Sequence, residues 1–246
     1  MELNDLANST GEWLRGSGPE ADIVISSRIR LARNLADYPF MTRCSDQERM
    51  QIEKQMRECI SRFNCGVELL YINLEQLDEV DRQFLVERHL ISHELAEGRG
   101  ARAVAVDPAE TFSIMINEED HLRIQAIQSG LSLQSVWEKI NRLDDLIESH
   151  ATYAFHDKLG YLTACPTNVG TGMRVSVMVH LPALVLTRQI EKVFRSLQKI
   201  GLAVRGLYGE GSQGMGDFYQ ISNQVTLGRS EAELIKQVGD IVPVVI

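Results

Sequence analysis

Arginines recur on segments that the sequence predicts to be strands, and several of them would share one face. Arg28 and Arg30 lie two residues apart in an extended segment, so both side chains point to the same side. Arg123 and Arg174 fall on the polar side of segments with alternating polarity, and Arg205 precedes a glycine-rich turn. Any one of them alone is typical of a solvated or ion-paired surface residue. Because arginine binds phosphate groups in a bidentate fashion, five together would suit a polyanion such as a triphosphate with its metal.

Acidic side chains and one cysteine lie close to these arginines in the sequence. Glu118, Glu119 and Asp120 crowd one turn, and Glu210 follows a glycine at another. Exposure to solvent is the plainer interpretation of any one of these carboxylates. Two of them could also hold a cationic acceptor, one removing its proton as phosphorus is attacked. Cys165 precedes a turn rich in Gly and Thr, and a thiol beside arginines gains thiolate character that lets it interact with a cation.

Two other patterns suggest different chemistry and are weaker. Residues 209–214 read GxGxxG, but the segment after them alternates like a strand, whereas a dinucleotide fingerprint must open a helix. His89 and His93 are four residues apart and could share a metal, yet no third ligand stands out, so a structural or hydrogen-bonding role is favoured. The sequence has no GxxxxGK[ST], HRD with DFG, or HExxH motif. P-loop, protein-kinase-fold and zincin chemistry are therefore excluded.

The composition indicates a globular protein with an ample core. Of the 246 residues, 44% are hydrophobic, which excludes a disordered or fibrous chain. Arg and Lys number 25 against 34 Asp and Glu, and the net charge of −9 disfavours binding to nucleic acid. No apolar stretch approaches roughly 18 residues, so we expect neither a secretory signal nor a membrane span, and a cytoplasmic protein. The four cysteines match neither a disulfide framework nor a zinc ribbon, and we expect reduced thiols.

The elements that would position these side chains follow from apolar periodicity. A capping box at Ser45 opens a predicted helix that reaches Phe63, and further helices are predicted over 133–147 and, after Pro182, over 186–200. Strands are predicted at 112–116 and 122–126, joined as a hairpin, and at 173–179 and 219–227. Clean alternation favours an antiparallel sheet with helices covering one face, an α+β fold. Pro243 is expected to interrupt a helix that begins near Ser230.

Four motifs along the chain resemble one family. They are Ser-Ser-Arg-Ile-Arg-Leu-Ala-Arg at 26–33, Asn-Glu-Glu-Asp-His-Leu-Arg at 117–123, Cys-Pro-Thr-Asn-Val-Gly-Thr-Gly-Met-Arg at 165–174, and Arg-Gly-Leu-Tyr-Gly-Glu at 205–210. Together they are similar to the ATP:guanidino phosphotransferases, or phosphagen kinases, and within that family to the bacterial protein-arginine kinases. The resemblance implies an antiparallel β-sheet flanked by helices, as in the glutamine synthetase and guanidino kinase catalytic domains.

The resemblance also implies roles for particular residues, with ATP and Mg²⁺ as cofactors and no metal ligands from the protein. Glu119 and Glu210 would hold the acceptor guanidinium, either of them serving as base, and Cys165 would contact the guanidinium nitrogens. The nucleotide would lie against a larger set: Ser26, Ser27, Arg28, Ile29, Arg30, His89, Arg123, Arg174, Val175, Ser176, Val177, Met178, Arg205, Gly206, Leu207, Tyr208 and Gly209.

Two departures from the family's pattern bear on the substrate. Only 25 residues precede Ser26, where the metabolite kinases carry a helical domain that closes over a small acceptor. The chain also stops at Ile246, where the protein-arginine kinases continue into a domain that dimerises and binds phosphoarginine. We therefore expect an N-terminal segment at 1–22, a catalytic domain at 23–246, no such C-terminal domain, and an acceptor pocket open to arginine side chains of proteins.

The expected function is phosphorylation of protein arginines by MgATP, which by resemblance marks proteins for degradation in a bacterial stress response. Expected partners are proteins with exposed arginine, an activator protein and an ATP-driven unfoldase and protease, but neither nucleic acid nor membrane. One alternative is a kinase for free arginine or another small guanidino compound. A second is a non-catalytic module that binds nucleotide or arginine.

Overall fold

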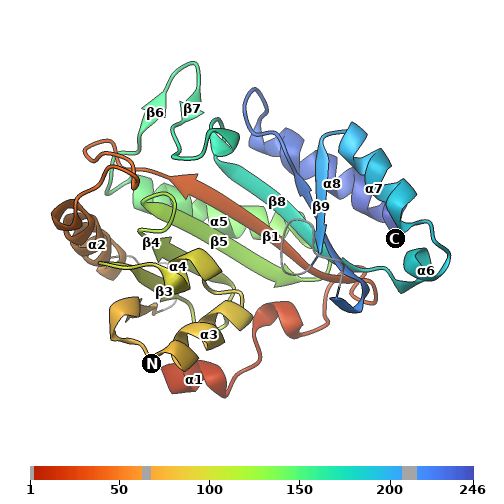
Figure 1. The fold of residues 1–246 in the computed structure, drawn as a ribbon, viewed down its shortest axis with the longest axis horizontal. Coiled ribbons are helices and arrows are strands. Elements are labelled where there is room, and N and C mark those ends of the chain that lie inside the picture. The colour runs from red at the N-terminus through yellow and green to blue at the C-terminus, as the bar shows by residue number, and fades with distance from the viewer. Residues whose placement is uncertain (1–2, 63–67, 207–214) are drawn as a thin grey trace.

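A computed structural model of the chain describes residues 3–62, 68–206 and 215–246. Its centre is an eight-stranded sheet with the strand order β2-β3-β4-β5-β1-β8-β10-β9, in which each neighbouring pair is antiparallel (Figure 1). The predicted antiparallel α+β fold is therefore confirmed. The strands are β1 (Val24–Arg33), β2 (Leu70–Asn73), β3 (Ala103–Val106), β4 (Phe112–Ile116), β5 (Leu122–Ser129), β8 (Met173–His180), β9 (Leu202–Gly206) and β10 (Phe218–Asn223).

Strand β1 lies in the middle of the sheet, and its alternating sequence separates the two faces. Ile29 and Leu31 are fully buried in the larger core, whereas Arg28 and Arg30 point to the opposite face. The register with β8 places Arg30 opposite Arg174. The ladder therefore brings together, across neighbouring strands, arginines that lie far apart in the sequence.

Four helices cover the face of the sheet that carries the larger core. They are α2 (Asp46–Ser61), α5 (Leu133–Glu148), α7 (Ile190–Lys199) and α8 (Glu231–Val245). The predicted capping box is present at α2, because the Ser45 hydroxyl accepts from the backbone N–H of Glu48 and the Glu48 carboxylate accepts from the N–H of Ser45. Ser230 and Glu233 form a second capping box at the start of α8.

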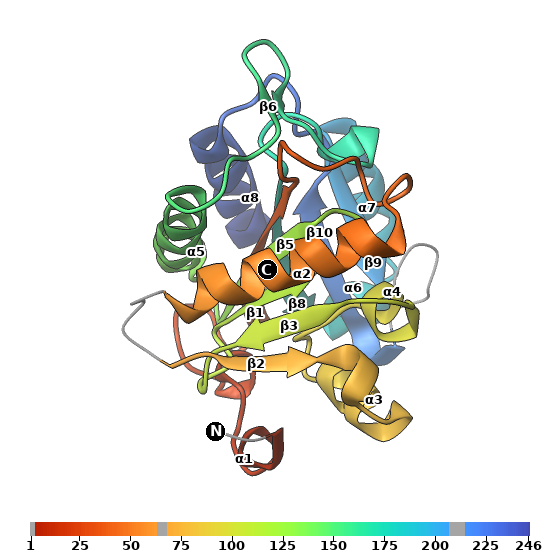
Figure 2. The same ribbon diagram turned by 90° about the vertical axis from the view of Figure 1, so that its left-hand side faces the viewer.

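The other face is covered at the β2–β4 end, which corrects the expectation that helices cover one face (Figure 2). There α1 (Leu3–Ala7), α3 (Glu79–Glu87) and α4 (His93–Glu97) pack over β2, β3 and β4 around a second core. The sequence of β3, Ala-Val-Ala-Val, is buried at all four positions. Such a continuous apolar run is what burial on both faces requires.

Three predicted boundaries were wrong. The helix predicted over 186–200 is two helices, α6 (Pro182–Leu186) and α7, separated at Arg188, whose φ is +57°. Pro243 does not interrupt α8, because it lies in the last turn of the helix and only Val244 and Val245 follow it there. The strand predicted to reach 227 ends at Asn223, and Val225 and Leu227 are half exposed.

The remaining short elements lie between the larger ones. They are a hairpin of β6 (Phe155–His156) and β7 (Gly160–Tyr161), and the 3₁₀ helices η1 (Glu12–Leu14), η2 (Leu74–Gln76), η3 (Pro166–Asn168) and η4 (Met215–Asp217). Cys44, Cys59 and Cys165 carry free thiols, while Cys65 lies outside the described residues. Among the helices of the described ranges, none has the length and apolarity needed to cross a lipid bilayer.

Candidate active site

A pocket of about 1070 Å³ opens over the polar face of β1, β5 and β8. The loop between α3 and α4 forms one wall, and η1 and the 163–172 segment contribute to its ends. The five arginines predicted to act together, Arg28, Arg30, Arg123, Arg174 and Arg205, all line it. They reach it from four strands, β1, β5, β8 and β9, because each occupies a polar-face position of its strand.

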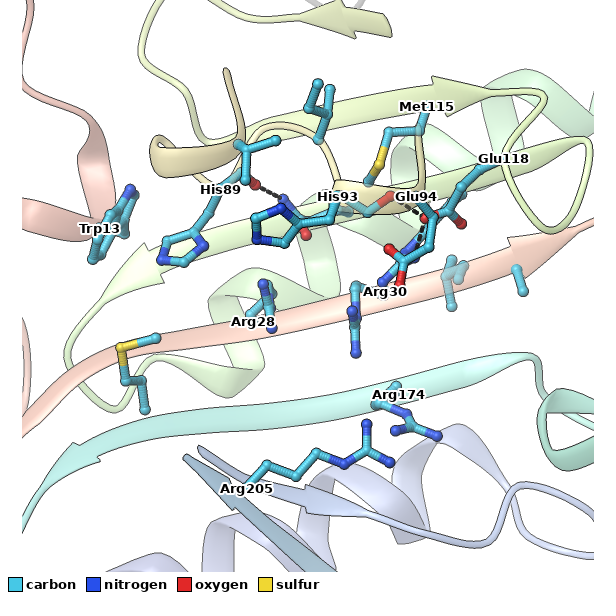
Figure 3. A pocket seen from close by; sticks show the side chains of 18 of the residues that line it. Trp13, Arg28, Arg30, His89, His93, Glu94, Met115, Glu118, Arg174 and Arg205 are labelled. Atoms are coloured by element: carbon cyan, nitrogen blue, oxygen red, sulfur yellow. Dashed lines mark hydrogen bonds and ion pairs between the residues drawn. The ribbon is translucent and has the colours of Figure 1, made fainter. Parts of the chain in front are cut away.

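Figure 3 shows how these groups are arranged along the pocket. Trp13 and His89 lie together near one end, with their ring centroids 4.7 Å apart. Glu94 and Glu118 lie toward the other end, and arginines from the sheet occupy the space between. The pocket therefore has an aromatic end, a cationic middle and an acidic end.

Two arginines of the cationic middle, Arg28 and Arg30, form no ion pair with any of the described residues. Burial, followed by the positive charges of Arg123 and Arg174, lowers the pKa of Arg28 to about 10. The same effects, with Arg28 added, lower the pKa of Arg30, and the opposing charge of Glu118 does not outweigh them. Arg28 donates to the neutral side chain of Gln220 at 2.8 Å, and the buried Nε of Arg30 has no hydrogen-bond partner in the described part of the chain. An anion would offset this mutual repulsion.

Glu118 is hydrogen-bonded to other residues of the pocket wall. Its Oε1 accepts from Arg123 Nη1 and from the hydroxyl of Ser92, whose same oxygen caps α4 through the N–H of Leu95. The acid turn, residues 117–121, is thus tied both to a pocket arginine and to the helix opposite. Glu118 is therefore better placed to orient Arg123 than to bind a further cation.

Glu119 is the exposed carboxylate of this turn, and it lines the pocket. Desolvation by the pocket walls, followed by the negative charges of Asp120 and Glu118, raises the pKa of Glu119. A carboxylate with a raised pKa accepts a proton more readily at near-neutral pH. Glu119 therefore has the location and the electrostatic surroundings of a general base.

Cys165 lines the same pocket at the start of η3. Its Sγ lies 3.0 Å from the hydroxyl oxygen of Thr167. The structure thus brings the predicted thiol and the predicted acid Glu119 to one pocket. The third predicted catalytic residue, Glu210, lies outside the described residues, as do Leu207, Tyr208 and Gly209.

The other predicted nucleotide residues divide into two groups. His89 and Met178 line the pocket. Seven do not, although they belong to strands that form its floor: Ser26, Ser27, Ile29, Val175, Ser176, Val177 and Gly206. Ile29, Val175 and Val177 are fully buried in the larger core on the opposite face.

Among the serines of that group, two have structural hydrogen bonds. The Ser27 hydroxyl donates to the Gly130 carbonyl at 2.8 Å and accepts from Ser132 N at 2.9 Å. Ser176 donates to the carbonyl of Arg28 at 3.2 Å. These contacts fix the strands that carry the arginines.

His89 takes an unusual backbone conformation, with a φ of +58°, at the turn between α3 and α4. Burial, followed by the positive charges of Arg28 and His93, lowers the pKa of His89 to about 4. Its ring is therefore neutral at ordinary pH. Within the described residues, no three His, Cys, Asp or Glu side chains gather as a metal site.

Several pocket residues were missed by sequence reasoning, chiefly Trp13, Glu94, Gln125 and Asn168. Trp13 lies in a segment without periodicity, so its sequence position carried no signal. Glu94 follows His93 in a segment whose two histidines, four residues apart, suggested a metal site rather than an acidic pocket wall. The packing of α4 over the sheet brings Glu94 to the site, whereas Trp13, Gln125 and Asn168 reach it from η1, β5 and η3.

Comparison with known proteins agrees with this geometry. A protein-family profile described as the C-terminal catalytic domain of ATP:guanido phosphotransferase matches residues 51–246. The protein-arginine kinase of Halothermothrix orenii is 51% identical over 236 residues, covering 96% of this chain and 67% of that protein. The protein-arginine kinase of Moorella thermoacetica is 50% identical over 242 residues, covering 97% and 69%. The chain thus spans about two thirds of the length of these relatives.

Solved structures give the same fold. A lombricine kinase superposes with a TM-score of 0.81 at 28% identity, covering 98% of this chain and 68% of that one. The duplicated taurocyamine kinase from Schistosoma mansoni, with bound transition state analog components, gives 0.80 at 27% identity, covering 99% and 35%. Sequence, fold and pocket agree, and the chain belongs to the ATP:guanido phosphotransferase family of phosphotransferase enzymes.

Proposed function

We propose that this protein transfers the γ-phosphoryl group of MgATP to arginine side chains of other proteins. The observation that carries the proposal is one pocket lined by five arginines together with Glu119 and Cys165. A triphosphate supplies a counter-charge for Arg28 and Arg30, which form no ion pair within the described residues. A guanidinium supplies the cation that a carboxylate and a thiol can hold.

The nucleotide would lie along the pocket with its phosphates among Arg28, Arg30, Arg123, Arg174 and Arg205. The neutral His89 and the indole of Trp13 would face the base, because aromatic surfaces pack well against a purine ring. The strand backbone around Ser26, Ser27, Ile29, Val175, Ser176, Val177 and Gly206 would support these contacts. Leu207, Tyr208 and Gly209, outside the described residues, are proposed for the same site. Mg²⁺ would enter with the nucleotide as part of the substrate.

The acceptor would bind at the acidic end. A guanidinium has a pKa above about 12, so a neighbouring carboxylate must take one of its protons before a nitrogen lone pair can attack phosphorus. We assign Glu119 or Glu210 to that proton, and the other carboxylate and Cys165 to orienting the group. The new N–P bond forms as the bond between the γ-phosphorus and the bridging oxygen breaks, and ADP leaves with that electron pair. The arginines offset the charge of the transferring group.

The choice of acceptor rests on the relatives. Those with about 50% identity are protein-arginine kinases, whereas the solved structures of similar fold, at 27–28% identity, are named for lombricine and taurocyamine. Glu119 is exposed at the pocket opening, where an arginine on a protein surface could reach it. A kinase for a small guanidino compound is the second candidate, favoured by the structural neighbours.

The wider role is proposed from the family resemblance of the sequence motifs. We propose residues 23–246 as the catalytic unit, with Trp13 from the N-terminal segment completing the pocket. A cytoplasmic bacterial enzyme of this kind would mark proteins for an ATP-driven unfoldase and protease and could answer to an activator protein. No role with nucleic acid or membrane is proposed.

The test is phosphotransfer from MgATP to unfolded casein or to free arginine, with acid-labile phosphate on arginine measured by mass spectrometry. We expect phosphoarginine on casein, and loss of it in Glu119→Ala, Glu210→Ala and Cys165→Ala. Phosphate that appears on free arginine alone would favour the small-acceptor kinase. Equal, near-zero transfer by the wild type and by Glu210→Ala would favour a non-catalytic binding module.

A further inference from the structure

Asp120 is a buried carboxylate of the acid turn, and it contacts the segment that carries Cys165. It is 2% exposed, although it borders the pocket. Its Oδ1 accepts two hydrogen bonds of 2.6 Å, one from the backbone N–H of Ala164 and one from the side-chain amide of Asn34. Ala164 is the residue before Cys165, and Asp120 is the residue after Glu119.

Asn34 extends this connection into the frame of the sheet. Its Oδ1 accepts from the N–H of His121 at 2.9 Å, and its Nδ2 also donates to the carbonyl of Leu162 at 3.1 Å. Its own carbonyl accepts from the N–H of Ala154 at 2.7 Å. Asn34 follows directly on β1, the central strand, so one side chain ties the acid turn and the 162–164 segment to the middle of the sheet.

The far side of the thiol loop, residues 163–172, is held by other groups. The Thr226 hydroxyl lies 2.9 Å from the carbonyl of Thr167 and 2.7 Å from that of Val169. On the Cys165 side, the Asp120 carboxylate and the Thr163 hydroxyl, which donates to the Cys165 carbonyl at 2.7 Å, are the polar side chains that hold the loop within the described residues. Losing the Asp120 contact would release the loop at the point where the thiol is attached.

We propose that Asp120, held by Asn34, is a positioning residue that fixes the thiol of Cys165 relative to the carboxylate of Glu119. It acts through its neighbours and does not touch the acceptor. This inference rests on the proposed function, because it assigns those two groups to one guanidinium. Positioning of this kind has large consequences, since a displacement of about 1 Å can cost roughly 10²-fold in rate.

The chain offers a matched control in Asp107. It is also buried, at 3% exposure, and accepts from one side chain and one backbone N–H, those of Thr111 and Phe112. It lies in the turn between β3 and β4, away from the pocket lining. Asp107→Ala therefore removes the same kind of contact without touching the proposed link.

The experiment measures the rate at which iodoacetamide alkylates Cys165, resolved by peptide mass spectrometry, together with the KM for casein and the Kd for ATP. In Asp120→Ala we expect faster alkylation, a raised acceptor KM and a kcat lowered by about 10²-fold, with the nucleotide Kd unchanged. Asp120→Asn keeps an oxygen for the Ala164 N–H and should lie between Asp120→Ala and the wild type. Asp107→Ala should lower the melting temperature and leave alkylation and acceptor KM as in the wild type.

Alkylation and acceptor KM of Asp120→Ala that match the wild type would overturn the inference, as would equal changes in Asp107→Ala. If Asp120→Ala does not fold, Asn34→Ala weakens the same link from outside the pocket lining, and the same readouts apply. Alkylation needs no turnover, so it tests the link even if casein proves not to be the substrate. A wild type that phosphorylates casein beside an Asp120→Ala variant with unchanged thiol chemistry would refute the link alone.

Discussion

The two faces of strand β1 place arginine side chains in opposite electrostatic surroundings. On the helix-covered face, Arg33 is 2% exposed and donates to Asp144 Oδ2 from Nε at 3.1 Å and from Nη2 at 2.7 Å. Its guanidinium also lies 3.6 Å from the ring centroid of Tyr161 and donates to the Thr171 carbonyl at 2.9 Å. On the pocket face, Arg28 and Arg30 form no ion pair with any described carboxylate and lie among other arginines, whose charges lower the pKa of both.

The difference separates a structural arginine from a binding arginine. A buried cation that serves the fold carries its own counter-ion, because an unpaired buried charge is costly. A cation that serves a ligand is left without one, and the positive charges nearby make that ligand's binding more favourable. Arg33 donates four hydrogen bonds within the fold. Arg28 and Arg30 form no ion pair within the described residues and are therefore suited to bind an anion.

The largest effect on stability should come from breaking the buried ion pair between Arg33 and Asp144. Arg33→Met leaves Asp144 buried without its counter-ion and should lower the free energy of unfolding by about 3–5 kcal/mol. Denaturation with urea measures it. Lys236→Met, which removes an exposed ion pair with Asp240, is the control and should have a much smaller effect. Similar losses in the two variants would show that the Arg33 pair is not special.

Removing an arginine from the pocket face should not destabilise the protein. Arg30→Gln removes a charge that its neighbours repel, so the free energy of unfolding should stay the same or rise. The same change should lower kcat/KM for phosphotransfer by about 10³-fold, because a phosphate-binding guanidinium is lost. Urea denaturation and steady-state kinetics on one preparation check both. A variant that loses stability as strongly as Arg33→Met would place Arg30 with the structural arginines.

Alternating polarity was enough to predict which arginines share a face, but not the wall opposite them. Arg28, Arg30, Arg123 and Arg174 could be grouped because a strand fixes the side of each residue from its neighbours. The position of α3 and α4 depends on the second core, which forms only when β2 and β3 join the sheet edge. Local periodicity does not contain that long-range pairing.

The same limit explains the site residues that were missed. Trp13 reaches the pocket because Leu6, in the same N-terminal segment, is buried in the second core. Ser27, by contrast, belongs to a motif of the family but is hydrogen-bonded to Gly130 and Ser132 beneath the pocket floor. A motif identifies a segment that matters, and only the fold separates its binding residues from its supporting ones.

The smallest expected effect concerns pH. The pKa of Glu119 is raised chiefly by desolvation, and Glu94 adds to this in last place. Because the ionised carboxylate is the active form, activity should be full above its pKa and fall as pH drops through it. Glu94→Gln removes one negative charge, lowers the pKa of Glu119 and so moves the acid limb of kcat/KM to lower pH.

Glu97→Gln in the same helix is the control for this shift, because Glu97 is exposed and does not line the pocket. Its acid limb should coincide with that of the wild type. An acid limb that moves equally in both variants would mean that the general charge of α4, and not the Glu94 contact, sets the pKa.

The effect of ATP on stability tests the central claim most directly, namely that Arg28 and Arg30, which form no ion pair within the described residues, bind the anion of the nucleotide. A ligand at 100 times its Kd stabilises the native state by about 2.7 kcal/mol. We predict that MgATP raises the free energy of unfolding of the wild type by about that amount and leaves the Arg28→Gln, Arg30→Gln double variant nearly unchanged at the same concentration. Equal stabilisation of the two proteins would contradict the assignment of the pocket.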